Sequence, residues 1–173
     1  RIENMMRGVA ASTTGCTLDL YLVGGGTEYY RNLEALADDL GDRIRILPPV
    51  RPEALVETLN AYDVGVHVLP PTNTNNALAL PNKFFDYVQA RLAMIIGPTQ
   101  AMADLLAQYD LGIVTDDFDP ASLTRAIERL DDQRVSSFKS SAGDAAKRLS
   151  AGPQNDIWFS AITAIAPVET RQS

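Results

Sequence analysis

The sequence predicts an α/β protein in which a parallel sheet is covered by helices on both faces. Short apolar runs closed by Gly, Pro or Asp alternate with longer amphipathic runs, and most connections between them are short. This alternation is typical of successive β-α units, whose strands lie parallel. After residue 130 the short apolar runs stop, so we expect a helical extension at the C-terminus.

Five strands are predicted, at residues 18–24, 43–49, 64–70, 93–98 and 111–116. Helices are expected over residues 28–40, 52–61, 82–91, 100–108 and 120–130. Within the first of these, helical spacing predicts one buried face, made by Leu33, Leu36, Ala37 and Leu40. The chain opens in an amphipathic pattern with no strand before it, so we interpret the sequence as a fragment that lacks its first strand.

The composition indicates an ordinary globular domain, with 173 residues of which 46% are hydrophobic and 21% charged. A net charge of −7 with scattered basic residues argues against nucleic-acid binding. With one cysteine, Cys16, and one histidine, His67, there is no internal disulfide and no Cys/His zinc set. We therefore expect no bound metal and a cytoplasmic location. No apolar run reaches the roughly 18 residues that a membrane-spanning helix needs.

Ligands of such sheets bind outside the carboxyl ends of the strands. Three loops fall there, at residues 24–28, 48–53 and 70–83, and the third is unusually long and polar. Long loops in compact domains are more often functional than incidental. The helix that follows this third loop is therefore the most informative part of the chain.

Asn82 is predicted to be the N-cap of that helix, which would leave backbone N–H groups and the positive end of the helix dipole facing the crevice. Lys83 would add a full charge to this anion site. Asp86, one turn later on the same face, could accept hydrogen bonds from a pair of sugar hydroxyls. The alternative is an ordinary i, i+3 surface ion pair between Lys83 and Asp86, which the spacing alone favours.

Other features also allow a functional and a structural interpretation. The acidic run at residues 115–120 could hold a metal, but Asp119 before Pro120 is an ordinary helix start, which we favour. His67 could be a general base, yet among valines in the middle of a strand it is better interpreted as a core or near-core histidine. The glycines around Gly25 fit a phosphate-binding turn and a tight strand-to-helix turn equally well.

Four segments carry a family resemblance. LPNKFFDYVQARLAMIIG resembles the PxKxxEYxAxGxPVV segment of retaining glycosyltransferases of family 4, also called group 1, whose two Rossmann-like domains form the GT-B fold. LYLVGGGTE, DRIRILPPVRPEALVETLNAYDVGVHVLPPT and LGIVTDDFDPASLTRAIERL are similar to successive segments of the C-terminal, nucleotide-sugar-binding domain of that family. The resemblance covers about residues 18–130. It implies a Rossmann-like donor-binding domain over residues 1–150, and a helix and tail over 151–173 that cross back to an absent N-terminal domain.

The resemblance also implies roles for individual residues. Asp86 matches the position of a glutamate that binds the ribose hydroxyls, although an aspartate is one methylene shorter. Lys83 and Asn82 fall beside the diphosphate, and Val50 and Arg51 fall on the loop whose backbone meets the nucleobase.

Two further positions bear on the donor. Gly25 belongs to the glycine-rich turn at the crevice wall. Many family members carry a second carboxylate that approaches the donor sugar, and this chain has Leu78 there. Asn75 or Asn76 could serve in its place.

The expected function is therefore the donor-binding half of a retaining, metal-independent glycosyltransferase. Its substrate would be a nucleotide diphosphate sugar, with no separate cofactor, and its partner would be its own N-terminal domain. Any peripheral membrane contact would go through that missing half, and this fragment alone should be inactive. The alternative is a non-catalytic nucleotide-binding or protein-interaction α/β module, although the Asp, Thr and Lys of a receiver domain are not found.

Overall fold

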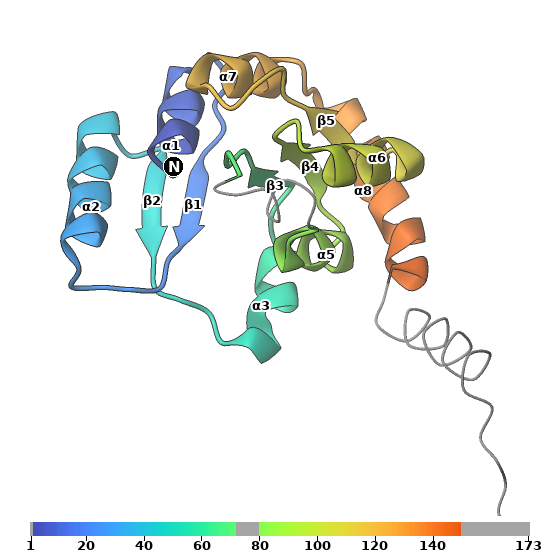
Figure 1. Cartoon of the computed structure of the whole chain (residues 1–173), viewed down its shortest axis with the longest axis horizontal. Helices are drawn as coiled ribbons and strands as arrows, with labels where there is room; N and C mark the ends of the chain where they lie inside the picture. The colour runs from blue at the N-terminus through green and yellow to red at the C-terminus, as the bar shows by residue number, and fades with distance from the viewer. Residues whose placement is uncertain (1, 72–79, 150–173) are drawn as a thin grey trace, which may run out of the picture.

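The computed structural model describes residues 2–71 and 80–149 (Figure 1). Its strands are β1 (Leu18–Tyr21), β2 (Ile44–Leu47), β3 (Val64–His67), β4 (Ala93–Ile96) and β5 (Gly112–Val114). Its helices are α1 (Ile2–Ala11), α2 (Glu28–Leu40), α3 (Pro52–Leu59), α5 (Asn82–Gln89), α6 (Gln100–Tyr109), α7 (Pro120–Glu128) and α8 (Asp132–Arg148). The predicted helix starts at residues 28, 52, 82, 100 and 120 are confirmed. The predicted helix over residues 151–173 lies outside the described residues, as do Asn75, Asn76 and Leu78.

All strand pairs in the described residues are parallel, so the predicted α/β class is confirmed. The pairs do not form one continuous sheet, however: β1 pairs with β2 in one ladder, and β3, β4 and β5 form a second. Between the two ladders, β1 and β3 lie on opposite sides of a cavity and do not hydrogen-bond to each other.

The strands are shorter than the apolar runs that predict them. The third strand was expected over residues 64–70, but β3 ends at His67. The prolines at positions 70 and 71 cannot donate a backbone hydrogen bond, which favours an early end to the ladder. His67 consequently lies at the carboxyl edge of its strand, and the expectation that it occupies the middle of a strand is wrong.

Two clusters of buried side chains form the core. One cluster joins α1 and α2 to the strands, and it includes Leu33 and Ala37, with Leu36 and Leu40 packed against it, so the predicted face of α2 is confirmed. The other cluster joins α5, α6 and α8 to β4 and β5, and every residue of β4 is buried. The burial of β4 explains its uninterrupted apolar sequence, since both of its faces are covered.

Helix α1 is fixed against α7, which begins more than 100 positions later. The Thr124 hydroxyl donates to the Gly8 carbonyl at 2.8 Å, and the Asn4 amide donates to the Phe118 carbonyl at 3.2 Å. Gly8 is buried at this contact, where an added Cβ would lie 2.9 Å from the Pro120 carbonyl oxygen. The two helices can approach this closely because Gly8 has no side chain.

None of the helices within residues 2–71 and 80–149 is long and apolar enough to cross a membrane.

Candidate functional site

Helix α5 presents two different faces. Phe84 and Val88 are 1% and 0% exposed and pack into the core, whereas Asn82 and Lys83 are exposed at the start of the helix. This division follows from helical spacing, which puts positions 84 and 88 on one face and positions 83 and 86 on another. Burial of Phe84 and Val88 therefore fixes the direction in which the first turn of α5 points.

The predicted N-cap of α5 is wrong by one position. The helix begins at Asn82, and Pro81 is the N-cap, with an extended backbone (φ −70°, ψ 146°) that the proline ring favours. The Pro81 carbonyl accepts the Phe84 N–H at 3.0 Å, and no side chain caps the helix. Asn82 and Lys83 occupy the first two helical positions, where backbone N–H groups have no carbonyl one turn earlier in the helix. The helix therefore begins where it was predicted, although Asn82 does not cap it.

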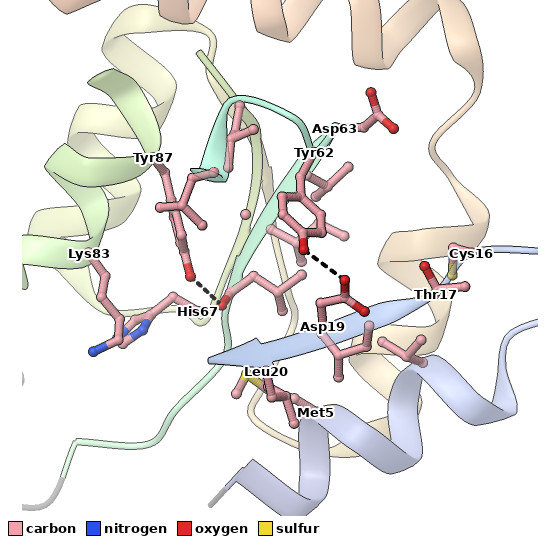
Figure 2. A pocket seen from close by; sticks show the side chains of 18 of the residues that line it. Met5, Cys16, Thr17, Asp19, Leu20, Tyr62, Asp63, His67, Lys83 and Tyr87 are labelled. Atoms are coloured by element: carbon pink, nitrogen blue, oxygen red, sulfur yellow. Dashed lines mark hydrogen bonds between the residues drawn. The ribbon is translucent and has the colours of Figure 1, made fainter. Parts of the chain in front are cut away.

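A cavity of about 1300 Å³ opens between β1 and β3 and extends to this helix start. Figure 2 shows Lys83 and His67 at one end of it and Asp19 and Tyr62 further along. The candidate residues that line the cavity are Val50, Asn82, Lys83 and Asp86. They come from the loop after β2 and from the first turns of α5, so both elements supply groups at the carboxyl ends of the strands.

The other candidates that the structure describes do not line this cavity. Arg51 is exposed as the N-cap of α3. Gly25 is exposed in the turn after β1, between Gly24 and Gly26, whose φ angles are 108° and 86°. Since those two φ values strain any residue with a side chain, the tight strand-to-helix turn explains two of the three glycines.

Lys83 and Asp86 do not form the ion pair that their spacing favours, although their charges interact. Burial raises the pKa of Asp86 above its usual 3.8, and the nearby Lys83 charge offsets part of that rise. Burial also lowers the pKa of His67 below 6.5, and the Lys83 charge lowers it further. Among the described residues, Lys83 has no carboxylate partner in an ion pair. Its charge is therefore available to an anion at the cavity mouth.

A partly buried polar network on the cavity wall was not predicted. The Tyr62 hydroxyl donates to Asp19 at 2.7 Å and lies 2.7 Å from the Tyr21 hydroxyl. Arg45 donates to both oxygens of Asp19, at 2.6 and 2.8 Å. The available signal was the alternation of β1, which places Asp19 and Tyr21 on the same face of an otherwise apolar strand.

The prediction also missed Tyr87. Its ring packs on Gly65, where an added Cβ would lie only 2.5 Å from the ring. Its hydroxyl donates to the Val66 carbonyl at 3.1 Å, and burial raises its pKa to about 12 (Figure 2). Gly65 and Tyr87 together fix α5 on β3, which positions Lys83 and Asp86 over the carboxyl end of that strand.

The acidic side chains before α7 make contacts with neighbouring groups of the protein itself. Arg125 donates to Asp116 at 2.8 Å, and the Asp119 N–H donates to Asp117 at 2.8 Å. Asp119 is the N-cap of α7, as predicted. In the described ranges there is no group of three or more His, Cys, Asp or Glu side chains that could hold a metal ion.

The sequence matches the family described as glycosyl transferases group 1 over residues 2–133. Because this match covers most of the chain, the protein belongs to the group 1 glycosyltransferases. The resemblance to that group is confirmed. No curated protein matches the sequence significantly.

Two solved structures share the fold of this chain. HepE of Anabaena, crystallised in complex with UDP and glucose, superposes with a TM-score of 0.71 at 15% identity, covering 92% of this chain and 44% of HepE. WaaG, a glycosyltransferase involved in lipopolysaccharide biosynthesis, gives a TM-score of 0.62 at 15% identity, covering 96% of this chain and 43% of WaaG. The chain thus spans less than half the length of either of these proteins.

Proposed function

We propose that this chain is the C-terminal, donor-binding domain of a retaining glycosyltransferase of family 4, and that a nucleotide diphosphate sugar binds where α5 begins. The observation that carries the proposal is the meeting of Val50, Asn82, Lys83 and Asp86 on one cavity at the carboxyl ends of the strands. A crevice at that edge is the usual ligand site of parallel α/β sheets. The acceptor would bind to a second domain outside this chain.

The roles follow from the chemistry of each group. The first N–H groups of α5 and the Lys83 ammonium would hold the diphosphate, since a helix start and a cation both favour negative charge. Asp86 would accept hydrogen bonds from the ribose hydroxyls, and the backbone around Val50 would meet the base. Charge develops on the diphosphate as the sugar leaves, so groups fixed at this position would stabilise the transition state more than the ground state.

Support comes from two sides. The family match makes a glycosyltransferase the expected activity of the complete protein. HepE, which shares the fold, was crystallised with UDP and glucose, and these bound molecules fit a nucleotide sugar as the donor for this chain.

Calorimetric titration of the chain with UDP, GDP and ADP tests the proposal. One of the three should bind, and Asp86→Ala and Lys83→Met should each weaken it about tenfold or more, because each removes a charge-assisted contact. Asp38→Ala on α2 and Arg148→Met on α8 are matched controls with exposed side chains away from the cavity, and they should bind as the wild type does. Absence of heat with all three nucleotides would refute the proposal. Wild-type affinity in Asp86→Ala would remove the role of that residue alone.

Metal independence and the lack of turnover by this chain alone are two parts of the proposal that separate experiments test. Metal independence predicts that EDTA leaves nucleotide affinity unchanged, and a loss of binding that added Mg²⁺ restores would contradict it. The missing acceptor domain predicts that this chain binds the donor without transferring sugar. Turnover by the chain alone, measured as release of the nucleoside diphosphate with an acceptor present, would show that the active site is already complete.

A further inference from the structure

His67 lies at the carboxyl end of β3 and lines the same cavity as Lys83 and Asp86. Its side chain points to the same face of β3 as Gly65, because residues two positions apart in a strand share a face. An added Cβ on Gly65 would lie 2.5 Å from the Tyr87 ring of α5, so α5 covers this face. The His67 ring therefore lies on the α5 side of β3, close to the start of the helix.

Figure 2 shows the His67 ring beside the Lys83 side chain at this end of the cavity. Within residues 2–71 and 80–149, no group hydrogen-bonds to the ring and no carboxylate forms an ion pair with it. The pKa of the ring is lowered by burial and, to a smaller extent, by the Lys83 charge. The free protein therefore presents a neutral, unpartnered imidazole to the cavity at neutral pH.

Titratable side chains from three neighbouring parts of the chain line the cavity around this ring: Lys83, Asp86 and Tyr87 on α5, Tyr62 before β3, and Asp19 and Tyr21 on β1. The strand partner β4 contributes none. Asp19 lies further along the cavity than Lys83 and already receives hydrogen bonds from Arg45 and Tyr62 (Figure 2). Among the described side chains, Lys83 is therefore the charged group that acts on the ring.

We propose that His67 is a further donor-binding residue and that it couples donor binding to the uptake of a proton. This inference rests on the proposed function, because the diphosphate that His67 would meet is the one placed beside Lys83. A neutral ring can donate one N–H to a phosphate oxygen. A protonated ring would add a second positive charge beside Lys83, and its hydrogen bond to the phosphate would be charge-assisted.

The sign of the coupling follows from the charges. The negative charges of the diphosphate would offset the Lys83 charge and act on the ring directly, and both effects favour the protonated imidazole. The pKa of His67 would therefore be higher in the complex than in the free protein. A group of this kind strengthens binding as the pH falls through its pKa in the complex. Protonation of Asp86 would act in the opposite direction, because it removes an acceptor for the ribose hydroxyls.

Calorimetric titration with UDP-glucose, GDP-mannose and ADP-glucose tests the coupling. Both phosphates of these probes are esterified, so the ligand itself takes up no proton between about pH 5 and about pH 8. The donor that binds should bind about threefold to tenfold more tightly at about pH 5.5 than at about pH 8. Proton uptake should also make the measured heat differ between two buffers of different ionisation enthalpy. Equal affinities at both pH values, with equal heats in both buffers, would overturn the inference.

His67→Gln keeps a side-chain N–H donor but cannot take up a proton. This variant should lose both the gain in affinity at low pH and the dependence of the heat on the buffer. Asp38→Asn is the matched control, because it removes an exposed titratable group of α2 away from the cavity and should keep the wild-type pH profile. A gain at low pH that persists in His67→Gln would assign the proton to another group and overturn the inference.

NMR titration of His67 in Lys83→Met provides a second test, which needs no change at position 67 and so holds even if His67→Gln does not fold. At saturating donor the pKa of His67 should still rise in this variant, because the phosphates act on the ring directly. An unchanged pKa would show that His67 senses the donor only through Lys83, which would overturn the inference and leave the proposed function intact. Failure of all three donors to bind at every pH would refute both.

Discussion

Tyr62 donates its hydroxyl to the Asp19 carboxylate at 2.7 Å and thereby links the segment just before β3 to β1. The side chain of Asp19 is only 4% exposed, and Arg45 neutralises it through two short hydrogen bonds. No backbone hydrogen bond joins the β1–β2 ladder to the β3–β4–β5 ladder in the described residues. The Asp19–Tyr62 bond is therefore one of the few polar connections across the cavity.

Tyr62→Phe should destabilise the protein by about 1–2 kcal/mol, because it leaves a buried carboxylate oxygen without one of its donors. Urea unfolding followed by circular dichroism measures the change. Tyr29→Phe is the matched control, since Tyr29 is 50% exposed and its hydroxyl makes a long, 3.4 Å contact with Glu3. Equal stabilities for the two variants would show that the Asp19–Tyr62 bond contributes nothing.

The Asp19 carboxylate should also make the stability of the protein depend on pH in the acidic range. Burial alone would raise the pKa of Asp19, but hydrogen bonds from Arg45 and Tyr62 outweigh burial and hold the pKa below its usual 3.8. A lowered pKa in the folded state contributes stability above pH 3.8, and that stability is lost as the pH falls through the folded-state value. Unfolding midpoints measured from about pH 6 to about pH 2 should fall less steeply in Asp19→Asn than in the wild type. Parallel curves would contradict this assignment.

His67 reports on the charge of Lys83. It is the only histidine in the sequence, so its ring signals in an NMR titration need no assignment. The pKa should lie below 6.5, chiefly because of burial. Lys83→Met should raise the pKa without restoring 6.5, since only the smaller cause is removed. A bound nucleoside diphosphate should also raise it by neutralising Lys83. An unchanged His67 titration in Lys83→Met would show that the two groups do not interact.

The contact between Gly65 and Tyr87 connects stability to the candidate site. In Gly65→Ala the new Cβ would lie 2.5 to 2.8 Å from three atoms of the Tyr87 ring, so the ring and α5 must shift. We expect a loss of about 1–3 kcal/mol, typical of overpacking, together with weaker nucleotide binding. Gly143→Ala on α8 is the control: its Cβ would meet nothing within 4 Å, and it should stabilise the helix by about 0.5–1 kcal/mol. Unfolding and calorimetric titration of both variants check the prediction.

Local signals in the sequence predicted the helices well and the contacts between distant elements poorly. Thr27 before α2 and the prolines that open α3 and α7 fix helix starts through capping and ring geometry, and these starts are confirmed. The end of β3 and the division into two ladders depend on which strands meet, which local propensity does not determine.

The residues around the candidate site also fall into two groups, those that local spacing predicted and those that only the packing reveals. Lys83 and Asp86 lie within one turn of a helix, so their spacing brought them together in the prediction. Their meeting with Val50 on one cavity follows from the rule that strand ends share an edge of the sheet. Asp19 and Tyr62 are 43 positions apart, and only the packing of β1 near the segment before β3 shows that they touch. The binding roles of the site residues stay predictions until a nucleotide is titrated.

The contact between α1 and α7 has a consequence for biosynthesis. The Thr124 hydroxyl and the Gly8 carbonyl that meet there are separated by 116 positions. While the ribosome is still making the intervening chain, the side of α1 that will touch α7 has nothing to pack against, and contacts between such distant positions form slowly. A nascent chain whose synthesis stops before α7 would therefore expose the face of α1 that α7 covers in the folded protein. Exposed faces of this kind are surfaces that chaperones bind.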